Sequence, residues 1–416
     1  MGDILQEIYS SLRNNKLRTA LTGFAVSWGI FLLICLLGTG NGLMNAFQGS
    51  TSTYVSNSMA VFGGQTSKPA NGYKEGRWIR LDEGDIAITK SKEFADNIDV
   101  VAPVSSSFGA TLVLGQKTIS GILRGVYPEY ADIEKVIIKE GRFINPLDMA
   151  EKRKVAVINT RQDKELGGNS LGKWISAGSF SVLVVGIYQT DESDFDSSVY
   201  MPYSTIRAIY TQGDKINRLY FTFSGINGLK ESKAFEERYG TAIKKYHEAA
   251  PDDENAIWIW NRYSENIQMN QASNILQIAL WILGLLTLVS GIVGVSNIML
   301  ISVKERTREF GIRKAIGAKP KNILGLIIAE SVTITAIFGY LGMVLGMVAC
   351  EVLDKTVGQK AVDIGFTSLK MLENPSVGLD VAFEATLLLI IAGTIAGLAP
   401  ALKASRVRPI EALNAD

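Results

Sequence analysis

Four runs of the sequence are long, apolar and almost free of charge. No Asp, Glu, Lys or Arg lies between Arg18 and Lys68, and none lies between Glu265 and Lys304. A bilayer core about 30 Å thick is crossed by roughly 20 apolar residues in a helix, because a helix satisfies its own backbone hydrogen bonds. The pattern therefore predicts four transmembrane helices. They cover the runs Ala20–Leu37, Leu280–Val303, Ile323–Val348 and Leu387–Leu402.

The long segment between the first two runs, residues 46–270, has the mixed pattern of a soluble domain. A strand–helix–strand order is predicted twice within it, and hairpins are predicted around Gly115 and Gly178. We therefore expect an α+β domain of two subdomains, with a β-rich insertion at about residues 130–200. The two units consist of Met59–Phe62, Asp82–Asn97 (Asp82 being the N-cap) and Val100–Val104, and of Leu219–Phe223, Gly228–His247 and Ala256–Trp260.

Two of the predicted helices are longer than a membrane is thick. Residues 266–303 would extend about 57 Å as a helix, which leaves the polar, uncharged part Asn266–Ala279 outside the lipid. The first helix could likewise continue past Gly42. These extensions form either a stiff stalk, which would carry movement between the two sides, or ordinary linkers, which would not.

Lysine and arginine residues are concentrated in three short segments at the ends of the predicted spans. These segments carry a net charge of +7, although the whole chain carries only +1. Because cytoplasmic loops are enriched in Lys and Arg, we expect both termini and the turn 304–321 to be cytoplasmic. The first span is expected to be retained, since no small-residue cleavage site follows it. The cations are Arg13, Lys16, Arg18, Lys304, Arg306, Arg308, Arg313, Lys314, Lys319, Lys321, Lys403, Arg406 and Arg408.

The expected fold class is thus a membrane protein of four transmembrane helices, with a large α+β extracytoplasmic domain inserted between the first and second helices. The expected segments are a cytoplasmic amphipathic segment (1–18), helix 1 (19–45), the outer domain (46–270), the stalk and helix 2 (271–303), a cytoplasmic helical turn (304–321), helix 3 (322–350), an outer loop (351–380), helix 4 (381–402) and a cytoplasmic tail (403–416).

Composition excludes several classes of protein. A near-neutral charge argues against nucleic-acid binding, and two cysteines with one histidine argue against a disulfide scaffold or a His/Cys metal site. The segment Gly167–Lys173 resembles a phosphate-binding loop, but Trp174 replaces the hydroxyl residue and a strand is expected to follow. We therefore expect no catalytic residues, no bound cofactor and no metal in this chain.

The remaining single features have simple explanations. We expect His247 to be a solvated surface residue, and Cys35 and Cys350 to pack as small apolar side chains. The acidic cluster of Asp191, Glu192, Asp194 and Asp196 is expected to be a solvated loop or, less simply, a contact for a basic partner.

Two features lie within the predicted spans. Glu330 is a carboxylate inside the third span, where an isolated charge is costly. It either pairs with the nearby basic turn or forms an inter-helix hydrogen bond that changes with conformation. The G-x-x-x-G pairs of Gly342 with Gly346 and of Gly393 with Gly397 allow close helix contact, either within one subunit or across a dimer.

The turn between the second and third spans carries interleaved acidic and basic residues around two glycines. As a helix it would place Phe310, Lys314 and Gly317 near one face, and Glu305, Arg308 and Glu309 on another. Charge needed only for membrane orientation would require cations alone. The turn therefore predicts a docking surface for a cytoplasmic protein.

Here the sequence resembles a known family, the MacB/LolC/FtsX-like permeases of ABC transporters. The strongest likeness is V-K-E-R-T-R-E-F-G-I-R-K-A-I-G-A, residues 303–318, followed by Glu330 and Ser331. Three further passages agree with it, so the likeness covers nearly the whole chain. They are Asn15–Leu21, Glu140–Phe143 with Asp148 ahead of Val155–Ile158, and Pro400–Ala401 with Arg408–Leu413.

The resemblance implies that the turn is a coupling helix seated on an ABC ATPase. The chain would be a permease without an ATPase site of its own, and ATP would be bound by a separate cytoplasmic subunit. A second permease copy or a paralogue would complete a dimer in the bacterial inner membrane, and a periplasmic adaptor could join it. The coupling residues implied are Glu305, Arg306, Arg308, Glu309, Gly311, Arg313, Lys314, Gly317 and Ala318, with Glu330 as an intramembrane polar residue.

The resulting hypothesis is mechanotransmission, in which ATP hydrolysis reshapes the outer domain to export peptides or small toxic molecules. Three alternatives stay open. They are lipoprotein release from the outer leaflet, FtsX-like control of cell-wall hydrolases, and a receptor or scaffold with no ATPase.

Overall fold

The computed structural model describes residues 16–51, 54–190, 197–210, 213–358, 361–363, 368–370 and 372–406. The chain forms two compact units. One comprises Met1–Phe47, Ser273–Val362 and Leu369–Asp416, and the other comprises Gln48–Ala272 and Asp363–Ser368. The expectations for the N-terminal segment 1–15, the acidic cluster 191–196 and the tail 407–416 lie outside the described residues.

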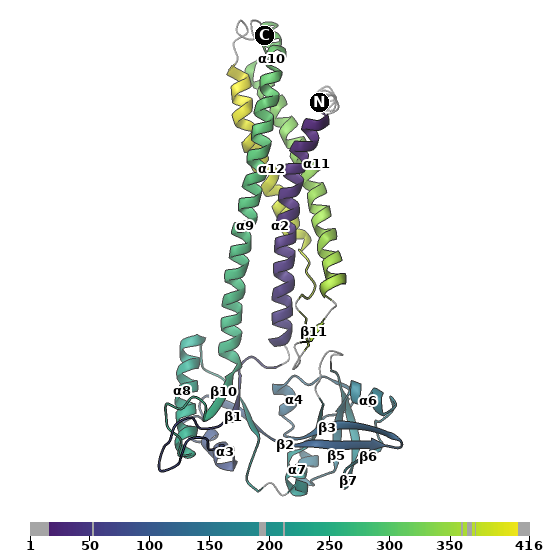
Figure 1. Cartoon of the computed structure of the whole chain (residues 1–416), viewed down its shortest axis with the longest axis vertical. Coiled ribbons are helices and arrows are strands. Elements are labelled where there is room, and N and C mark those ends of the chain that lie inside the picture. Colours follow the sequence, from purple (N-terminus) through teal and green to yellow (C-terminus); the bar gives the residue numbers. More distant parts are fainter. Residues whose placement is uncertain are drawn as a thin grey trace. The chain divides into compact units, whose positions relative to one another are not determined.

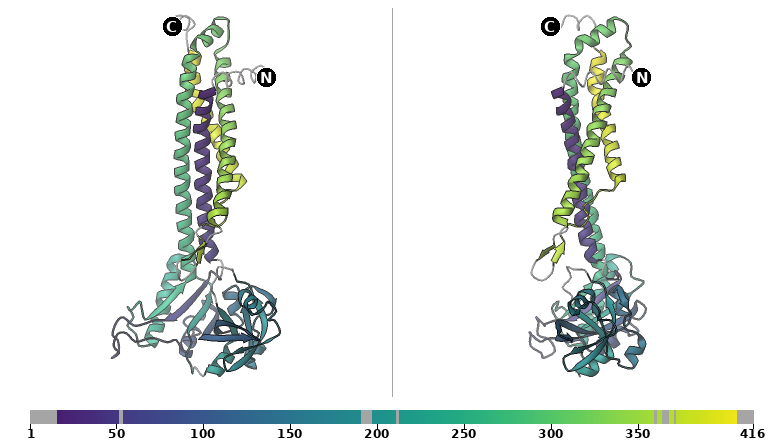
Figure 2. Two further views of the ribbon diagram at one scale, coloured as in Figure 1. Left: turned by 45° about the vertical axis from the view of Figure 1, so that its right-hand side comes forward. Right: turned by 90° about the vertical axis from the view of Figure 1, so that its right-hand side faces the viewer.

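The first unit is a bundle of four long helices that lie side by side (Figures 1 and 2). They are α2 (Lys16–Thr51), α9 (Arg262–Glu305), α11 (Pro320–Leu353) and α12 (Leu379–Arg406). Stretches long and apolar enough to cross a membrane are Thr19–Ala46, Arg262–Glu305, Pro320–Gly358 and Ala382–Leu402. The prediction of four transmembrane helices is therefore confirmed.

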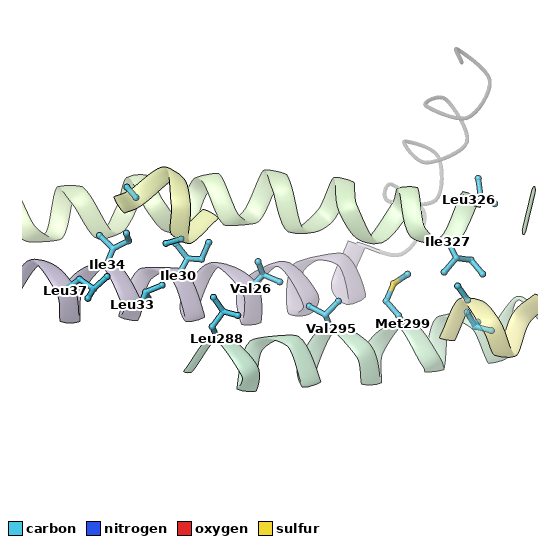
Figure 3. Packing of buried hydrophobic residues seen from close by; sticks show 14 of the residues in the cluster. Val26, Ile30, Leu33, Ile34, Leu37, Leu288, Val295, Met299, Leu326 and Ile327 are labelled. Atoms are coloured by element: carbon cyan, nitrogen blue, oxygen red, sulfur yellow. The ribbon is translucent and has the colours of Figure 1, made fainter. Parts of the chain in front are cut away.

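Branched and unbranched apolar side chains fill the centre of the bundle (Figure 3). Ile30 and Ile34 of α2 are fully buried, and Leu288 and Val295 of α9 are almost so. Ile327 of α11 joins the same core. The lipid-facing sides keep large apolar residues exposed, as expected of helices whose solvent is hydrocarbon.

Both G-x-x-x-G pairs are used for packing within the chain. A Cβ placed on Gly342 would collide with the backbone of Ser27 in α2, and one placed on Gly346 would lie 2.8 Å from Cβ of Ile34. In α12, a Cβ on Gly397 would lie 2.9 Å from Oγ of Ser331. These glycines therefore let α11 approach α2, and α12 approach α11, as small residues do in membrane bundles.

Part of the segment 351–380, which was expected to be an outer loop, has regular secondary structure. Helix α11 continues to Leu353 and ends in a single π-helical turn, η1 (Asp354–Gly358). Two short strands, β11 (Ala361–Asp363) and β12 (Ser368–Lys370), then pair with each other.

The second unit is built on one ten-stranded sheet, whose strand order is β10-β1-β9-β2-β3-β8-β5-β7-β4, with β6 pairing with β2 and β7. Its strands are β1 (Ser58–Gly63), β2 (Ile98–Leu114), β3 (Lys117–Val126), β4 (Ile138–Gly141), β5 (Val155–Asn159), β6 (Trp174–Ala177), β7 (Phe180–Tyr188), β8 (Ser198–Pro202), β9 (Arg218–Phe223) and β10 (Ile257–Asn261). Its helices are α3 (Glu83–Thr89), α4 (Tyr130–Ile133), α5 (Pro146–Ala150), α6 (Thr160–Leu166), α7 (Tyr203–Tyr210) and α8 (Gly228–Tyr246).

The two predicted strand–helix–strand units are present, but they interleave. Strand β9 lies between β1 and β2, and β1 lies between β9 and β10, with antiparallel pairing throughout. Each unit is therefore a split βαβ motif. Helices α3 and α8 pack over the sheet, and Phe94, Phe235 and Tyr239 form an aromatic cluster in this core.

The first helix of these units is shorter than the predicted range Asp82–Asn97. Asp82 is the N-cap, as predicted, and its carboxylate accepts a hydrogen bond from the amide of Gly84. The helix ends at Thr89, because residues 90–97 form turns that bring the fully buried Phe94 against Tyr239.

Strand β2 connects the two halves of the sheet. Its first part pairs with β9 up to Val104, and its second part pairs with β3 from Ser105 onward. The β-rich half therefore includes β3 and the end of β2, both of which precede residue 130. The two predicted hairpins are confirmed, since Leu114 pairs with Lys117 and Ala177 pairs with Phe180.

Candidate coupling site

The turn between α9 and α11 contains a short helix, α10 (Thr307–Ala315). It is shorter than the expected helix 304–321. Arg306, with φ −92° and ψ 11°, separates it from α9, and Pro320 occupies the first turn of α11. The nine residues of α10 are thus bounded by breaks at both ends.

Gly317 ends this helix for a clear conformational reason. Its φ is +102°, in the left-handed region that residues with a Cβ rarely adopt. The amide of Gly317 donates to the carbonyl of Lys314 at 3.0 Å, and that of Ala318 donates to the carbonyl of Arg313 at 2.9 Å. This pair of bonds is a Schellman motif, which satisfies the last carbonyls of the helix.

Arg306 is the centre of an ion network at the base of α10. Its Nε donates to Glu309 Oε2 at 3.0 Å, and its Nη1 donates to Glu330 Oε2 at 3.2 Å. Glu309 also accepts a bond of 2.7 Å from Nη2 of Arg313. The network therefore ties the end of α9, the helix α10 and the span α11 together.

The charges of this network support one another. Burial by itself favours the neutral form of Glu309, but hydrogen bonds and charge from Arg306, with the charge of Arg313, hold the pKa of Glu309 below its ordinary value. Burial would also lower the pKa of Arg306, yet the bond to Glu309 and the charge of Glu330 raise it instead. Arg306 and Glu309 are therefore both charged near neutral pH.

Phe310 anchors α10 from the apolar side. It is 1% exposed and belongs to the core of the bundle, and the guanidinium of Arg306 lies 5.4 Å from the centre of its ring. Gly311 is buried beside it. One face of α10 is thus fixed by packing and by a cation–π contact.

The opposite face of α10 is exposed and partly apolar. Ile312 is 42% exposed and Ile316 is 82% exposed. Arg308 lies four residues before Ile312, so these three residues share one helical face. Among the residues that the structure describes, Arg308 makes no ion pair.

The structure therefore divides the sequence-predicted coupling residues into two groups. Arg306, Glu309 and Arg313 meet Glu330 inside the turn, whereas Glu305, Arg308 and Gly317 are exposed. Lys314 and Ala318 are half-buried. Sequence reasoning missed Ile312 and Ile316, although their spacing from Arg308 at intervals of four was visible.

Of the two roles weighed for Glu330, the structure contains pairing with the basic turn. Glu330 is 7% exposed and is paired with Arg306. The next residue, Ser331, donates to the carbonyl of Gly393 at 3.1 Å and so joins α11 to α12.

The expectation for His247 is wrong. Its side chain is only 10% exposed, and its Nε2 lies 2.9 Å from Oδ1 of Asp85, which is fully buried. The two residues are 162 positions apart and tie the end of α8 to α3. A buried carboxylate requires such a partner, but nothing local in the sequence identifies it.

Other candidate motifs have structural roles. The segment Gly167–Lys173 follows the end of α6, where Gly167 has φ +119°, and so does not open a helix at which phosphate could bind. Arg142 pairs with the buried Asp148 at 2.5 Å and 3.1 Å, which explains the Glu140–Phe143 motif as a clamp on α5. The thiol of Cys350 on α11 donates to the carbonyl of Ile34 on α2 at 3.7 Å, so Cys350 packs between these helices beside Cys35.

The chain is similar to known proteins over most of its length. The family model described as the MacB-like periplasmic core domain matches residues 19–229, and that described as the FtsX-like permease C-terminal matches residues 281–409. Proteins named Macrolide export ATP-binding/permease protein MacB, from Neisseria gonorrhoeae and Bdellovibrio bacteriovorus, are each 27% identical to this chain, over 97% and 100% of its length. The chain spans 59% and 62% of the length of these relatives.

A solved structure, the periplasmic region of MacB from Actinobacillus actinomycetemcomitans, is also similar. It has 24% sequence identity and a TM-score of 0.41, and the match covers 53% of this chain and 95% of that one. The two family models together cover the first span, most of the outer unit and the last three spans, and the chain belongs to the MacB/FtsX-like family of ABC transporter permeases.

Proposed function

We propose that this chain is the permease subunit of a MacB-like ABC transporter, and that a separate cytoplasmic ATPase subunit docks on α10. The observation that carries the proposal is the division of α10 into two faces. One face is held by Phe310 and the Arg306 network, while the other presents Ile312 and Ile316. A helix fixed in this way moves together with the spans that hold it.

The exposed face suits a protein partner better than water. Ile316, at the end of α10, is 82% exposed and so presents an apolar side chain to the solvent. Burying this side chain in a groove of a partner protein would release ordered water. Helices often dock through residues spaced three or four apart, and Arg308 adds a cation beside this side chain. The inferred partner surface is therefore an apolar socket with acidic residues near it.

The long helices supply a route for movement. Helix α9 has 44 residues, which corresponds to about 66 Å and exceeds the bilayer core of about 30 Å. Its hydrogen-bonded backbone runs without a break from Arg262 to Glu305. ATP-driven displacement of α10 would thus reach the extracytoplasmic unit as tilt or rotation of a helix.

The proposed cargo is peptides or small toxic molecules that are already outside the inner membrane. The relatives named for macrolide export support the small-molecule class. The proposed assembly contains two permeases, as copies or paralogues, and a periplasmic adaptor. Both chain termini and α10 would face the cytoplasm of a bacterial cell.

Copurification tests the proposal. The chain, extracted in detergent, is expected to carry an ATPase subunit with Walker motifs in stoichiometric amount. Ile316→Asp should remove that subunit, because a carboxylate cannot enter an apolar socket. The matched control is Ile137→Asp, since Ile137 is also exposed, at 63%, but lies in the outer unit.

A second pair of changes separates docking from coupling. Glu309→Ala with Arg313→Ala should abolish stimulation of the ATPase while membrane insertion stays normal. If the wild-type chain reproducibly carries no ATPase, the receptor or scaffold alternative gains support. If Ile316→Asp keeps its ATPase, the docking face is wrong.

A further inference from the structure

The root of helix α9 contains a buried arginine that the coupling site does not use. Strand β10 ends at Asn261 and α9 begins at Arg262, so no loop separates the sheet from the long helix. The side chain of Arg262 is 2% exposed. A buried cation at the first position of such a helix requires a specific set of partners.

Four elements of the outer unit converge on this guanidinium. Its Nη1 lies 2.7 Å from Oε1 of Glu134, which directly follows α4. Its Cζ lies 4.2 Å from the ring centre of Tyr54, 4.6 Å from that of Trp260 and 5.3 Å from that of Tyr220. Aromatic faces within about 6 Å attract a cation, so Arg262 is held by the charge of Glu134 and by the three rings.

These partners bring the two helical roots to one place. Tyr54 lies three residues after the end of α2, and the amide of its neighbour Val55 donates to the carbonyl of Ile133 at 2.8 Å. Trp260 belongs to β10 and Tyr220 to β9. Arg262 therefore joins the chain leaving α2 and the chain entering α9 to the same sheet.

The start of α9 is also fixed by its cap. Oδ1 of Asn261 accepts a bond of 3.0 Å from the amide of Ser264, as an N-cap does. Its Nδ2 donates to Oγ of Ser232 at 2.9 Å and to Oε2 of Glu236 at 2.8 Å, both on α8. The first turn of α9 thus has directional bonds on both sides.

Stability alone does not explain a charge at this position. Replacing a buried ion pair by apolar residues of similar volume is often neutral or stabilising, so an apolar side chain could fill the same space. An apolar side chain, however, slides over aromatic faces. A planar guanidinium that pairs with the carboxylate of Glu134, donates from Nη1 to Oγ of Ser58 at 3.5 Å and lies against aromatic rings has far fewer orientations. The arrangement favours a fixed angle between helix and sheet.

We propose that Arg262 is a positioning residue, which locks the root of α9 to the outer sheet so that movement of the helix turns the sheet instead of bending the strand–helix junction. This inference rests on the proposed function for its purpose, but the lock itself can be measured independently.

The test uses the full chain with its ATPase in lipid nanodiscs, in a cysteine-free background. Spin labels at Lys245 of α8 and Gln271 of α9, both exposed, report the angle at the junction. We expect a narrow distance distribution that ATP does not change. Arg262→Met should broaden it, and Arg262→Lys, which keeps the charge without the planar group, should give an intermediate width.

A second label pair, at Lys245 in each of the two permeases, reports movement of the outer units. ATP should shift this distance in the wild type, and Arg262→Met should lose the shift. The control is Arg142→Met, which removes the nearer arginine partner of the buried Asp148 and leaves it with Arg153 at 3.8 Å. This site lies at β4 and α5, at the other end of the sheet order. The control substitution should lower the unfolding temperature but keep both the narrow junction distance and the ATP-dependent shift.

The outcomes distinguish the positioning role of Arg262 from the proposed function. If Arg262→Met keeps a narrow junction distance and a normal shift, the positioning role is overturned. If Arg142→Met loses the shift as fully as Arg262→Met, the effect is general destabilisation and the positioning role is again overturned. If the wild type shows no ATP-dependent shift, the proposed function fails, while the junction distances still decide whether Arg262 is a lock.

Discussion

Replacing Glu330 by glutamine should weaken the docking of the ATPase although residue 330 is buried. The carboxylate accepts a bond of 3.2 Å from Nη1 of Arg306. Glutamine keeps the shape and an acceptor oxygen but loses the charge. Hydrogen bonds to charged groups contribute roughly 1.5–3 kcal/mol. The bond from the charged Arg306 to a glutamine oxygen should lie at the lower end of this range and the bond to a carboxylate near the upper end, so the change should cost about 1–1.5 kcal/mol. Because Arg306 keeps its bonds to Glu309, the larger cost of breaking a whole buried pair does not apply.

The lost stabilisation should increase the mobility of α10 and therefore weaken the interface between α10 and the ATPase. A difference of about 1.4 kcal/mol is a factor of ten in affinity, so binding of the ATPase to the permease in nanodiscs should weaken by up to about tenfold. Titration of labelled ATPase measures the effect, and thermal unfolding of the permease measures stability separately.

A double-mutant cycle makes the reasoning refutable. In an Arg306→Met background, Glu330 is a buried carboxylate without its arginine. The change Glu330→Gln should then be neutral or favourable, because it removes an uncompensated charge. If the effects of the two substitutions on affinity simply add, the ion pair does not position α10 and the reasoning is wrong.

Three further predictions follow from local geometry. Gly317→Ala should destabilise the cap of α10 by about 1–2 kcal/mol, because the left-handed conformation is costly for residues with a Cβ. The control is Gly325→Ala in the open interior of α11, which should be neutral or stabilising. Equal losses of ATPase affinity in the two variants would contradict this prediction. The pKa of Asp148 lies below its ordinary value of 3.8, because its arginine partner outweighs the effect of burial. The stabilisation that ionised Asp148 contributes is therefore present above pH 3.8 and lost as the pH falls through the lowered pKa. Unfolding temperatures measured from about pH 3 to 7 should drop in acid for the wild type and less steeply for Asp148→Asn. Cys350 Sγ lies 3.7 Å from the carbonyl oxygen of Ile34, the residue before Cys35, so mild oxidation should link Cys35 to Cys350 and join α2 to α11 within one chain. Proteolysis between the spans followed by non-reducing electrophoresis shows the link, and its failure to form would argue against this packing.

The sequence was sufficient for features that depend on local patterns. Charge-free length predicts the four spans, and alternation with turn residues predicts the hairpins at Gly115 and Gly178. Asp82 shows its capping role in sequence, because a carboxylate before an acidic first turn is an N-terminal signal. These features need no knowledge of distant residues.

The missed features all depend on residues brought together from afar. The pairing of His247 with Asp85 joins positions 162 residues apart, and Arg262 meets Glu134 and Tyr54 only because the strands interleave. The split order of β1, β9 and β2 follows from long-range pairing, which periodicity does not determine.

The exposure of Ile312 and Ile316 was missed for a different reason. Apolar residues between two membrane spans are normally expected to pack inward, as Phe310 does. The ion network and Phe310 together occupy the inner side of α10 and leave the isoleucines on the outside. The four charged members of that network were visible in sequence, but their meeting point was not.

Because β10 passes directly into α9, the number of residues in the first turns of α9 determines how the later part of the helix is rotated relative to the strand. A helix turns about 100° for each residue and advances about 1.5 Å. Inserting one residue between Arg262 and Ser273 would therefore rotate every later side chain of α9 by that angle relative to Arg262 and the strand before it. Insertions of seven residues, close to two full turns, would nearly restore the phase. The length of α9 therefore determines the rotation between its two ends, and we expect changes in that length to be tolerated only in steps of about seven residues.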